Sequence, residues 1–427
     1  MNRYRSIIGY INYIAFLVLL CAMPYAFQFI RFFGLVWAVS WLLELRFLKK
    51  EFIQITKSRM FVAVGFGIWV LWNVISIFWA DNKTMAWDTI QRDIYLLIIP
   101  IIMFLGVNEY YDWKQCVKVL VIGCIISIGV YLFTNYWLLN LEYVHNKHVA
   151  TRVNIDWLHL EDFTMNMKHR LHYTSLMCLA ILGISTLFVQ RQTNFKQTIL
   201  YCFAIVALLL GIYWTSSRAA ILNIGFIATI TALWIWTRKA IRSIGQKVVM
   251  VIAVALILVI GIVCFYKFYP RNANISISYI NNLPDGVTPP CEPRLAIWNS
   301  ALEAPQDYSL YGLGIGNSYD YMQSKYIAHG WEAYYTYHYS THSQLLATWI
   351  ELGFAAMVLW LLFWLAMPFV FHGKQRYWLA CISAVCLTNM ATDLFLGSVE
   401  GIVFTLVAFV LFDVFSRPFP SVVRPKP

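Results

Sequence analysis

Charged residues are scarce in this chain of 427 residues. Asp, Glu, Lys and Arg make up 12% of it, whereas soluble domains carry roughly 25%. Hydrophobic residues account for 60% and aromatic residues for 17%. This balance excludes an ordinary soluble domain. It predicts an all-α polytopic membrane protein, in which the aromatic residues anchor the helices at the membrane–water interfaces.

Signals for processing and for metal binding are also missing. Residues 7–23 are apolar, but no small-residue cleavage site follows them. We therefore expect a first transmembrane helix that serves as its own uncleaved signal. None of the nine cysteines forms a C-x-x-C pair, and all but Cys291 fall in or beside apolar stretches. This distribution argues against structural zinc and redox chemistry.

Apolar stretches long enough to span a bilayer recur along the chain. Twelve spans are predicted, at 7–23, 27–45, 61–79, 93–108, 117–138, 173–190, 198–214, 219–237, 248–268, 343–371, 378–396 and 401–416. Residues 1–268 thus hold spans one to nine, with an outer loop at 139–172. A large loop at 269–342 separates them from the last three spans and the tail at 343–427.

The positive charge predicts the orientation. The net charge of +11 could suggest a nucleic-acid partner, but in a membrane protein Lys and Arg gather in short cytoplasmic loops. With both termini inside, the inner segments hold Arg3, Arg5, Arg46, Lys49, Lys50, Lys57, Arg59, Lys114, Lys118, Arg191, Lys196, Arg238, Lys239, Arg242, Lys247, Lys374, Arg376, Arg417, Arg424 and Lys426. We therefore expect cytoplasmic termini, outer loops at 139–172 and 269–342, membrane lipids as surroundings and no nucleic-acid partner.

Three ionisable residues stand at the predicted outer boundary. Arg218 lies between spans seven and eight, Arg294 opens an amphipathic helix at 294–303, and His342 precedes span ten. Each has a structural interpretation, as an interfacial anchor, a surface charge and a helix cap. Together they favour a site for a lipid-borne anion, because two guanidiniums can grip a diphosphate and an imidazole can accept a hydroxyl proton.

The outer histidines offer a competing interpretation, a metal site. They form pairs three or four residues apart, which would share a helix face. The pairs are His145 with His148, His169 with His172, and His338 with His342. Their spacing matches no standard zinc pattern, so we predict a site without metal.

Three further residues are candidates for supporting the site. Glu351 follows His342 by nine residues and would point away from it on a straight helix, so we expect it to pair with another intramembrane helix and stabilise the fold. Asp393 could satisfy an outer arginine, and His338 lies one helical turn before His342.

Several motifs resemble the O-antigen ligase and polymerase superfamily. H-S-Q-L-L-x-x-x-x-E-L-G-F at 342–354 is similar to its histidine signature, and T-S-S-R-A-A at 215–220 is similar to its arginine hairpin. R-L-x-I-W-N-S-A-L at 294–302, followed by the glycine-rich turn Y-G-L-G-I-G-N at 311–317, resembles its periplasmic loop. The resemblance covers roughly residues 200–355, and the N-terminal half matches in hydropathy alone.

This resemblance implies a GT-C-like membrane glycosyltransferase with a large periplasmic loop between spans nine and ten. Its donor would be a glycan on undecaprenyl diphosphate, and its acceptor a hydroxyl of the lipid A-core oligosaccharide. The reaction would be inverting and independent of metal and cofactor, in the bacterial inner membrane. His342 would be the general base, Arg218 and Arg294 would bind the diphosphate, and Asp393 is carried over as an acidic residue near the end of the penultimate helix.

Three alternatives to a ligase stay open. An O-antigen polymerase would use the same donor, and a related enzyme would transfer the glycan to protein. A transporter of a lipid-linked or anionic solute belongs to another class. It would place polar residues and helix breaks at mid-membrane, whereas the ionisable residues here gather at the outer face.

Overall fold

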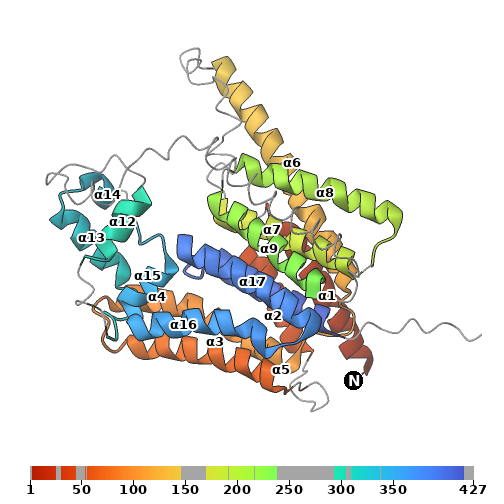
Figure 1. Ribbon diagram of the computed structural model, residues 1–427, viewed down its shortest axis with the longest axis horizontal. Helices are drawn as coiled ribbons and strands as arrows, with labels where there is room; N and C mark the ends of the chain where they lie inside the picture. Colours follow the sequence, from red (N-terminus) through yellow and green to blue (C-terminus); the bar gives the residue numbers. More distant parts are fainter. Residues whose placement is uncertain are drawn as a thin grey trace, which may run out of the picture.

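The chain folds as an assembly of helices in the computed structural model (Figure 1). The structure describes residues 2–25, 30–44, 53, 55–145, 170–190, 192–215, 217–237, 293–303, 308, 310–336 and 338–417, and no strand occurs among them. The helices are α1 Asn2–Ala22, α2 Ile30–Leu43, α3 Lys57–Ser76, α4 Lys83–Asp93, η4 Ile94–Leu97, α5 Ile98–Leu105, α6 Trp113–His145, α7 Arg170–Val189, α8 Phe195–Trp214, α9 Arg218–Thr237, α12 Pro293–Ala301, α13 Ser318–Ala328, α14 Glu332–Thr336, α15 Gln344–Leu352, α16 Phe354–Ala366, η7 Met367–Val370, α17 Gly373–Thr392 and α18 Val399–Ser416.

Six helices in the described part of the chain are long and apolar enough to cross a membrane, namely α3, α6, α7, α8, α9 and α18. Shorter apolar helices lie at Ile7–Ala22, Phe32–Leu43 and Phe354–Val370. Within the described residues the prediction of an all-helical chain is confirmed, and these apolar helices are consistent with a polytopic membrane protein. The span predicted at 248–268 lies outside the described residues, as do most of 139–172 and the start of 269–342, so the total of twelve spans remains a prediction.

Several helices begin where the sequence offers a capping side chain. Thr56 accepts a hydrogen bond from the backbone of α3, Asn82 from α4, Asn194 from α8, Ser343 from α15 and Ser398 from α18. Such side chains satisfy backbone N–H groups that have no partner within the helix. At α15 and α18 this chemistry fixes the ends of the two helices that flank the candidate site.

A buried ion cluster ties together one end of the bundle. Asp413, fully buried in α18, lies 2.8 Å from the guanidinium of Arg59 in α3 and 2.8 Å from that of Arg417. Its carboxylate also accepts the Val107 backbone N–H at 3.0 Å. A buried carboxylate is tolerated when charges and donors compensate it on every side. The cluster therefore joins α3, α18 and the segment between α5 and α6.

The opposite end of the bundle carries a small aromatic layer. Helices α12, α13 and α14 gather there beside α15 and α4 (Figure 1). Their own core includes Tyr308, Met322, Tyr326, Trp331 and Tyr334, and Ile350 of α15 packs into it. The layer therefore rests on α15, and the residues just before α15 lie where the layer meets the bundle.

The glycine-rich turn predicted at 311–317 lies along the end of α15. Gly312, Gly314 and Gly316 all have positive φ, at 75°, 93° and 83°. A Cβ on Gly312 would lie 2.3 Å from the Glu351 backbone, and one on Gly314 2.4 Å from Ala80. This close approach lets the N–H groups of Leu313 and Gly314 donate to the carbonyls of Ile350 and Glu351, which end α15.

The observed helices differ from the predicted spans in two places. The span at 343–371 is not one helix, because Gly353, with a φ of 89°, ends α15 and α16 begins after it. The segment before the span at 93–108 also contains an unpredicted polar helix, α4, which ends at Asp93. The glycine adopts a conformation closed to most side chains, and α4 has no long apolar run to reveal it.

Candidate functional site

His342 lies at the junction between the aromatic layer and α15. Its backbone has a φ of 45°, which non-glycine residues rarely adopt. Trp298 of α12 donates to the Thr341 carbonyl at 3.1 Å, and Ser343 caps α15 immediately afterwards. The flanking residues are thus fixed on both sides. The imidazole, with 26% of the side chain exposed, is both positioned and accessible.

Asp393 lies beside this imidazole although it is distant in sequence. It ends α17, and its Oδ1 is 3.5 Å from Nδ1 of His342. The Leu394 backbone donates to the same oxygen at 2.9 Å, and the N–H of Gln344 donates to the Asp393 carbonyl at 3.0 Å. The start of α15 is therefore joined directly to the end of α17.

Arg294 approaches the same carboxylate from a third element. In the first turn of α12, its Nη2 lies 4.0 Å from Oδ2 of Asp393, and 36% of its side chain is exposed. Asp393 thus stands between the predicted base and one predicted phosphate-binding arginine. The structure brings together three of the residues that the sequence singled out.

Arg218 starts α9 at the same end of the bundle. The Nδ2 of Asn223 in α9 donates to the Oδ1 of Asn389 in α17 at 3.0 Å, and the amide of Asn389 donates to Ser175 at 2.8 Å. In α9, Arg218 lies five residues from Asn223 in the direction of this end. In α17, Asp393 lies four residues from Asn389 in the same direction. At 1.5 Å per residue they are therefore roughly level.

The loop between α17 and α18 is held by contacts that sequence reasoning missed. Arg92 of α4 donates to the Gly397 carbonyl at 2.7 Å, and the Gly397 N–H donates to the Gln344 side chain at 3.0 Å. The His172 ring lies 3.1 Å from the Ser398 hydroxyl. No short motif signals these contacts, because each joins segments far apart in the chain.

Glu351 supports the fold, but through a partner other than the predicted one. The hydroxyl and the backbone N–H of Ser318 in α13 donate to its Oε1, at 2.5 and 3.3 Å. The expected pairing with an intramembrane helix is therefore wrong. The prediction assumed one straight helix over 343–371, whereas α15 ends at Leu352 and the glycine-rich turn covers Glu351.

His338 lies apart from the His342–Asp393 pair. It also has a positive φ, of 53°, and its exposed ring lies 6.1 Å from that of Tyr319 and 6.2 Å from that of Tyr335. Its neighbours are thus aromatic rings of the aromatic layer. Its predicted supporting role gains no contact from the structure.

Within the described residues, no group of three or more His, Cys, Asp and Glu side chains could hold a metal ion. His148, His159 and His169 lie outside these residues. Metal independence therefore stays a prediction. His172, one member of the predicted pairs, instead contacts Ser398 and stacks on Phe395.

A comparison with family models decides the class of protein. Residues 203–361 match the family model described as O-antigen ligase. This match supports membership of the O-antigen ligase/polymerase superfamily. No curated protein matches it. The matched segment includes Arg218, Arg294 and His342, whereas Asp393 lies beyond it. The match and the apolar helices together support a multi-pass, glycosyltransferase-like membrane protein, and the family implies a lipid-linked glycan and a lipid-anchored acceptor as general substrate classes.

Proposed function

We propose that this protein is an O-antigen ligase of the bacterial inner membrane. It would transfer a glycan from undecaprenyl diphosphate to a hydroxyl of the lipid A-core oligosaccharide at the periplasmic face, with both termini in the cytoplasm. The observation that carries the proposal is the convergence of His342, Asp393 and Arg294 from three elements at one end of the bundle. Arg218 stands at the same end.

His342 acts as the general base in this proposal. The Asp393 carboxylate, 3.5 Å from Nδ1, would favour the tautomer that carries the proton on Nδ1, which leaves the lone pair of Nε2 for the acceptor hydroxyl. The hydroxyl oxygen attacks the anomeric carbon while its proton passes to Nε2. The bond from that carbon to the diphosphate oxygen breaks on the opposite face, and its electron pair leaves with the diphosphate. The product is inverted at the anomeric carbon.

The arginines bind the leaving group. Guanidinium groups present planar donors that match phosphate oxygens, and they stabilise the negative charge that grows as the glycosidic bond breaks. Arg294 is partly exposed beside Asp393, and Arg218 starts α9 at the same level. With two cations on the diphosphate, the proposed reaction in this GT-C-like scaffold uses no metal ion and no cofactor.

The lipopolysaccharide of a deletion strain tests the assignment against a polymerase. Loss of a ligase leaves bare core while long glycan accumulates on the lipid carrier, and this is the expected gel pattern. Core capped by a single repeat unit would instead identify a polymerase. Unchanged lipopolysaccharide would remove both assignments.

His342→Ala tests the proposed base. Removing a general base typically costs 10²–10⁴-fold in rate, so transfer by the purified protein should fall by about that factor. His338→Ala is the matched control, because His338 is also a histidine with positive φ but lies among aromatic rings. Equal losses in the two variants, or near-normal transfer by His342→Ala, would refute the base assignment.

A further inference from the structure

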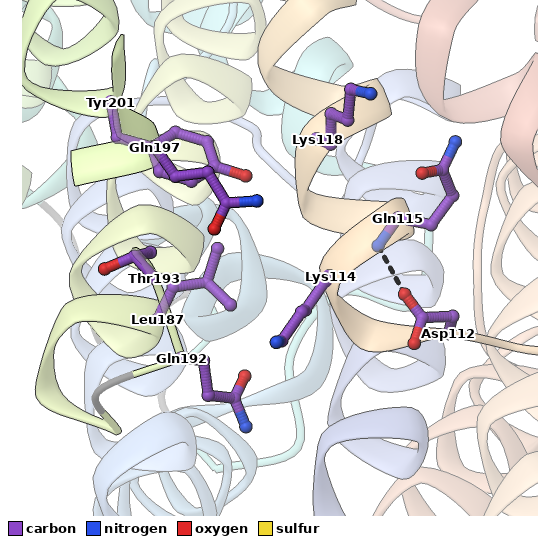
Figure 2. Close-up of a pocket in the computed structure, with 9 residues that line it drawn as sticks. All are labelled: Asp112, Lys114, Gln115, Lys118, Leu187, Gln192, Thr193, Gln197 and Tyr201. Atoms are coloured by element: carbon purple, nitrogen blue, oxygen red, sulfur yellow. Dashed lines mark hydrogen bonds between the residues drawn. The ribbon is translucent and has the colours of Figure 1, made fainter. Parts of the chain in front are cut away.

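A polar pocket lies at the end of the bundle away from His342 (Figure 2). Its volume is about 190 Å³, and it lies between the start of α6, the end of α7 and the start of α8. Helix α7 links it to the candidate site, since His172 near its start contacts Ser398 and Leu187 near its end lines the pocket. These fifteen residues rise by roughly 22 Å, so the pocket is a separate feature.

The walls of the pocket are suited to an anion. Lys114 and Lys118 lie one turn apart on α6, and Gln197 and Tyr201 of α8 face them across the pocket (Figure 2). The carboxylate of Asp112, which also lines the pocket, accepts the Gln115 N–H at 2.7 Å and caps α6. The pocket therefore has two ammonium groups, from Lys114 and Lys118, and one carboxylate, from Asp112, which already accepts a hydrogen bond. This leaves an excess of positive charge and of hydrogen-bond donors.

The surface that continues from the pocket along both helices is apolar and exposed. On α8, Leu200 and Phe203 are 66% and 70% exposed, and on α6 Ile122 is 41% exposed. Both helices are apolar enough to cross a membrane, so these side chains face lipid tails. The pocket volume equals that of about six waters at ~30 Å³ each, which accommodates a phosphate with its glycerol. A soluble anion would contact the polar pocket alone, whereas a phospholipid would contact both the pocket, through its headgroup, and the apolar surface, through its acyl chains.

We propose that the pocket binds the headgroup of an anionic phospholipid, whose acyl chains lie along α6 and α8. Lys114 and Lys118 pair with the phosphate, and the amide and phenol groups of α8 donate to the glycerol and phosphate oxygens. The site faces the leaflet opposite the one that holds the candidate transfer site. The positive-inside distribution makes this the cytoplasmic leaflet, where basic pockets between helices bind acidic lipids.

Thermal unfolding of the full-length protein in a neutral detergent tests this proposal. Short-chain phosphatidylglycerol should raise the unfolding temperature in a saturable manner, whereas phosphatidylcholine of the same chain length and inorganic phosphate should not. Each lysine near a phosphate contributes roughly fivefold in affinity, so Lys114→Gln and Lys118→Gln should each raise the half-saturating concentration by about that factor.

Lys57→Gln is the control, because it removes one exposed ammonium from the same end of the bundle, at the start of α3. It should leave the titration unchanged. If Lys114→Gln and Lys118→Gln had the same half-saturating concentration of phosphatidylglycerol as wild type, the site would be overturned. The same stabilisation by phosphate alone would overturn the lipid and indicate a soluble anion, and an equal response to phosphatidylcholine would remove the role of charge. The wild-type comparison of the three additives decides the ligand class even where a variant folds poorly.

Discussion

The backbone of His342 is strained where the proposed chemistry occurs. A left-handed residue other than glycine costs about 1–3 kcal/mol, which the surrounding structure must supply. Here Trp298 binds the preceding residue, Ser343 caps the following helix, and Asp393 accompanies the ring. The strain sets the direction of the side chain, since relaxation of the backbone would turn the imidazole away from Asp393.

Asp393→Asn tests whether this carboxylate positions the base. An amide can donate to Nδ1 and favour the tautomer whose Nε2 carries the proton, which cannot accept another one. We expect kcat to fall by about 10²–10⁴-fold. The donor KM should change little, because the 4.0 Å ion pair with the partly exposed Arg294 is weak.

Steady-state kinetics on the lipid-linked donor separate these effects. Asp393→Glu, which keeps the carboxylate, should recover part of kcat. Asp320→Asn provides the control, since it makes the same chemical change at an exposed position of α13, where the carboxylate accepts from Asn82. A rise in KM with normal kcat would show that Asp393 acts through Arg294 instead.

Among the structural elements, the glycine-rich turn at 311–317 couples the aromatic layer to α15. Its N–H groups satisfy the last carbonyls of the helix, so the turn does for α15 what a cap residue does elsewhere. Alternate glycines are needed because the turn lies against α15 at Gly312, against Ala80 just before α4 at Gly314, and against the start of α4 at Gly316.

Gly312→Ala should therefore destabilise the protein by about 3–4 kcal/mol. Left-handed alanine costs about 1–2 kcal/mol, and separating the two backbones breaks two hydrogen bonds worth about 1 kcal/mol each. Gly373→Ala isolates the first contribution, because Gly373 also has a positive φ, of 54°, but its Cβ would meet nothing within 4 Å. Chemical or thermal unfolding in detergent compares the two, and equal losses would show that contact with α15 is unimportant.

Hydropathy predicted the apolar helices because a helix that crosses a bilayer needs a long apolar run within its own sequence, so the signal is local. The short motifs around His342, Arg218 and Arg294 likewise identified side chains that lie at one end of the bundle. The sequence could not predict the partnership of His342 with Asp393, which depends on how α15 meets α17. Nor could it predict the partner of Glu351, which depends on the helix break at Gly353.

At the scale of the whole molecule, two buried carboxylates lie where the aromatic layer meets the bundle. Asp93 ends the polar helix α4 and accepts from Asn73 of α3, while Glu351 accepts from Ser318. Their helices, α4 and α15, are not among those of the described residues that are long and apolar enough to cross a membrane. Burial, together with the charge of Glu351, raises the pKa of Asp93 from 3.8 to about 7, although Arg92 opposes the shift. Burial also raises the pKa of Glu351, against the hydrogen bonds from Ser318.

The stability of the protein should consequently depend on pH. Between pH 3.8 and about 7 the folded protein keeps a proton on Asp93 that the unfolded chain has released. The free energy of unfolding therefore falls as pH rises through this window and stays lower above it. Asp93→Asn should flatten the slope and exceed wild type in stability above pH 7.

Unfolding temperatures measured from pH 4 to pH 8 test this expectation. Asp88→Asn, at an exposed position of the same helix, should retain the slope of wild type. An unchanged slope in Asp93→Asn would assign the pH dependence to other groups.

The contacts that Arg92, Gln344 and His172 make with the loop between α17 and α18 limit how this enzyme can be divided or recombined. The family match ends at residue 361, but the carboxylate beside His342 comes from residue 393, and Arg92 reaches the same loop from α4. A recombinant fragment of residues 203–361 would carry the histidine and both arginines without the surface that orients them. A chimaera made to exchange glycan specificity between relatives must therefore transfer α4 and α17 together with the central segment.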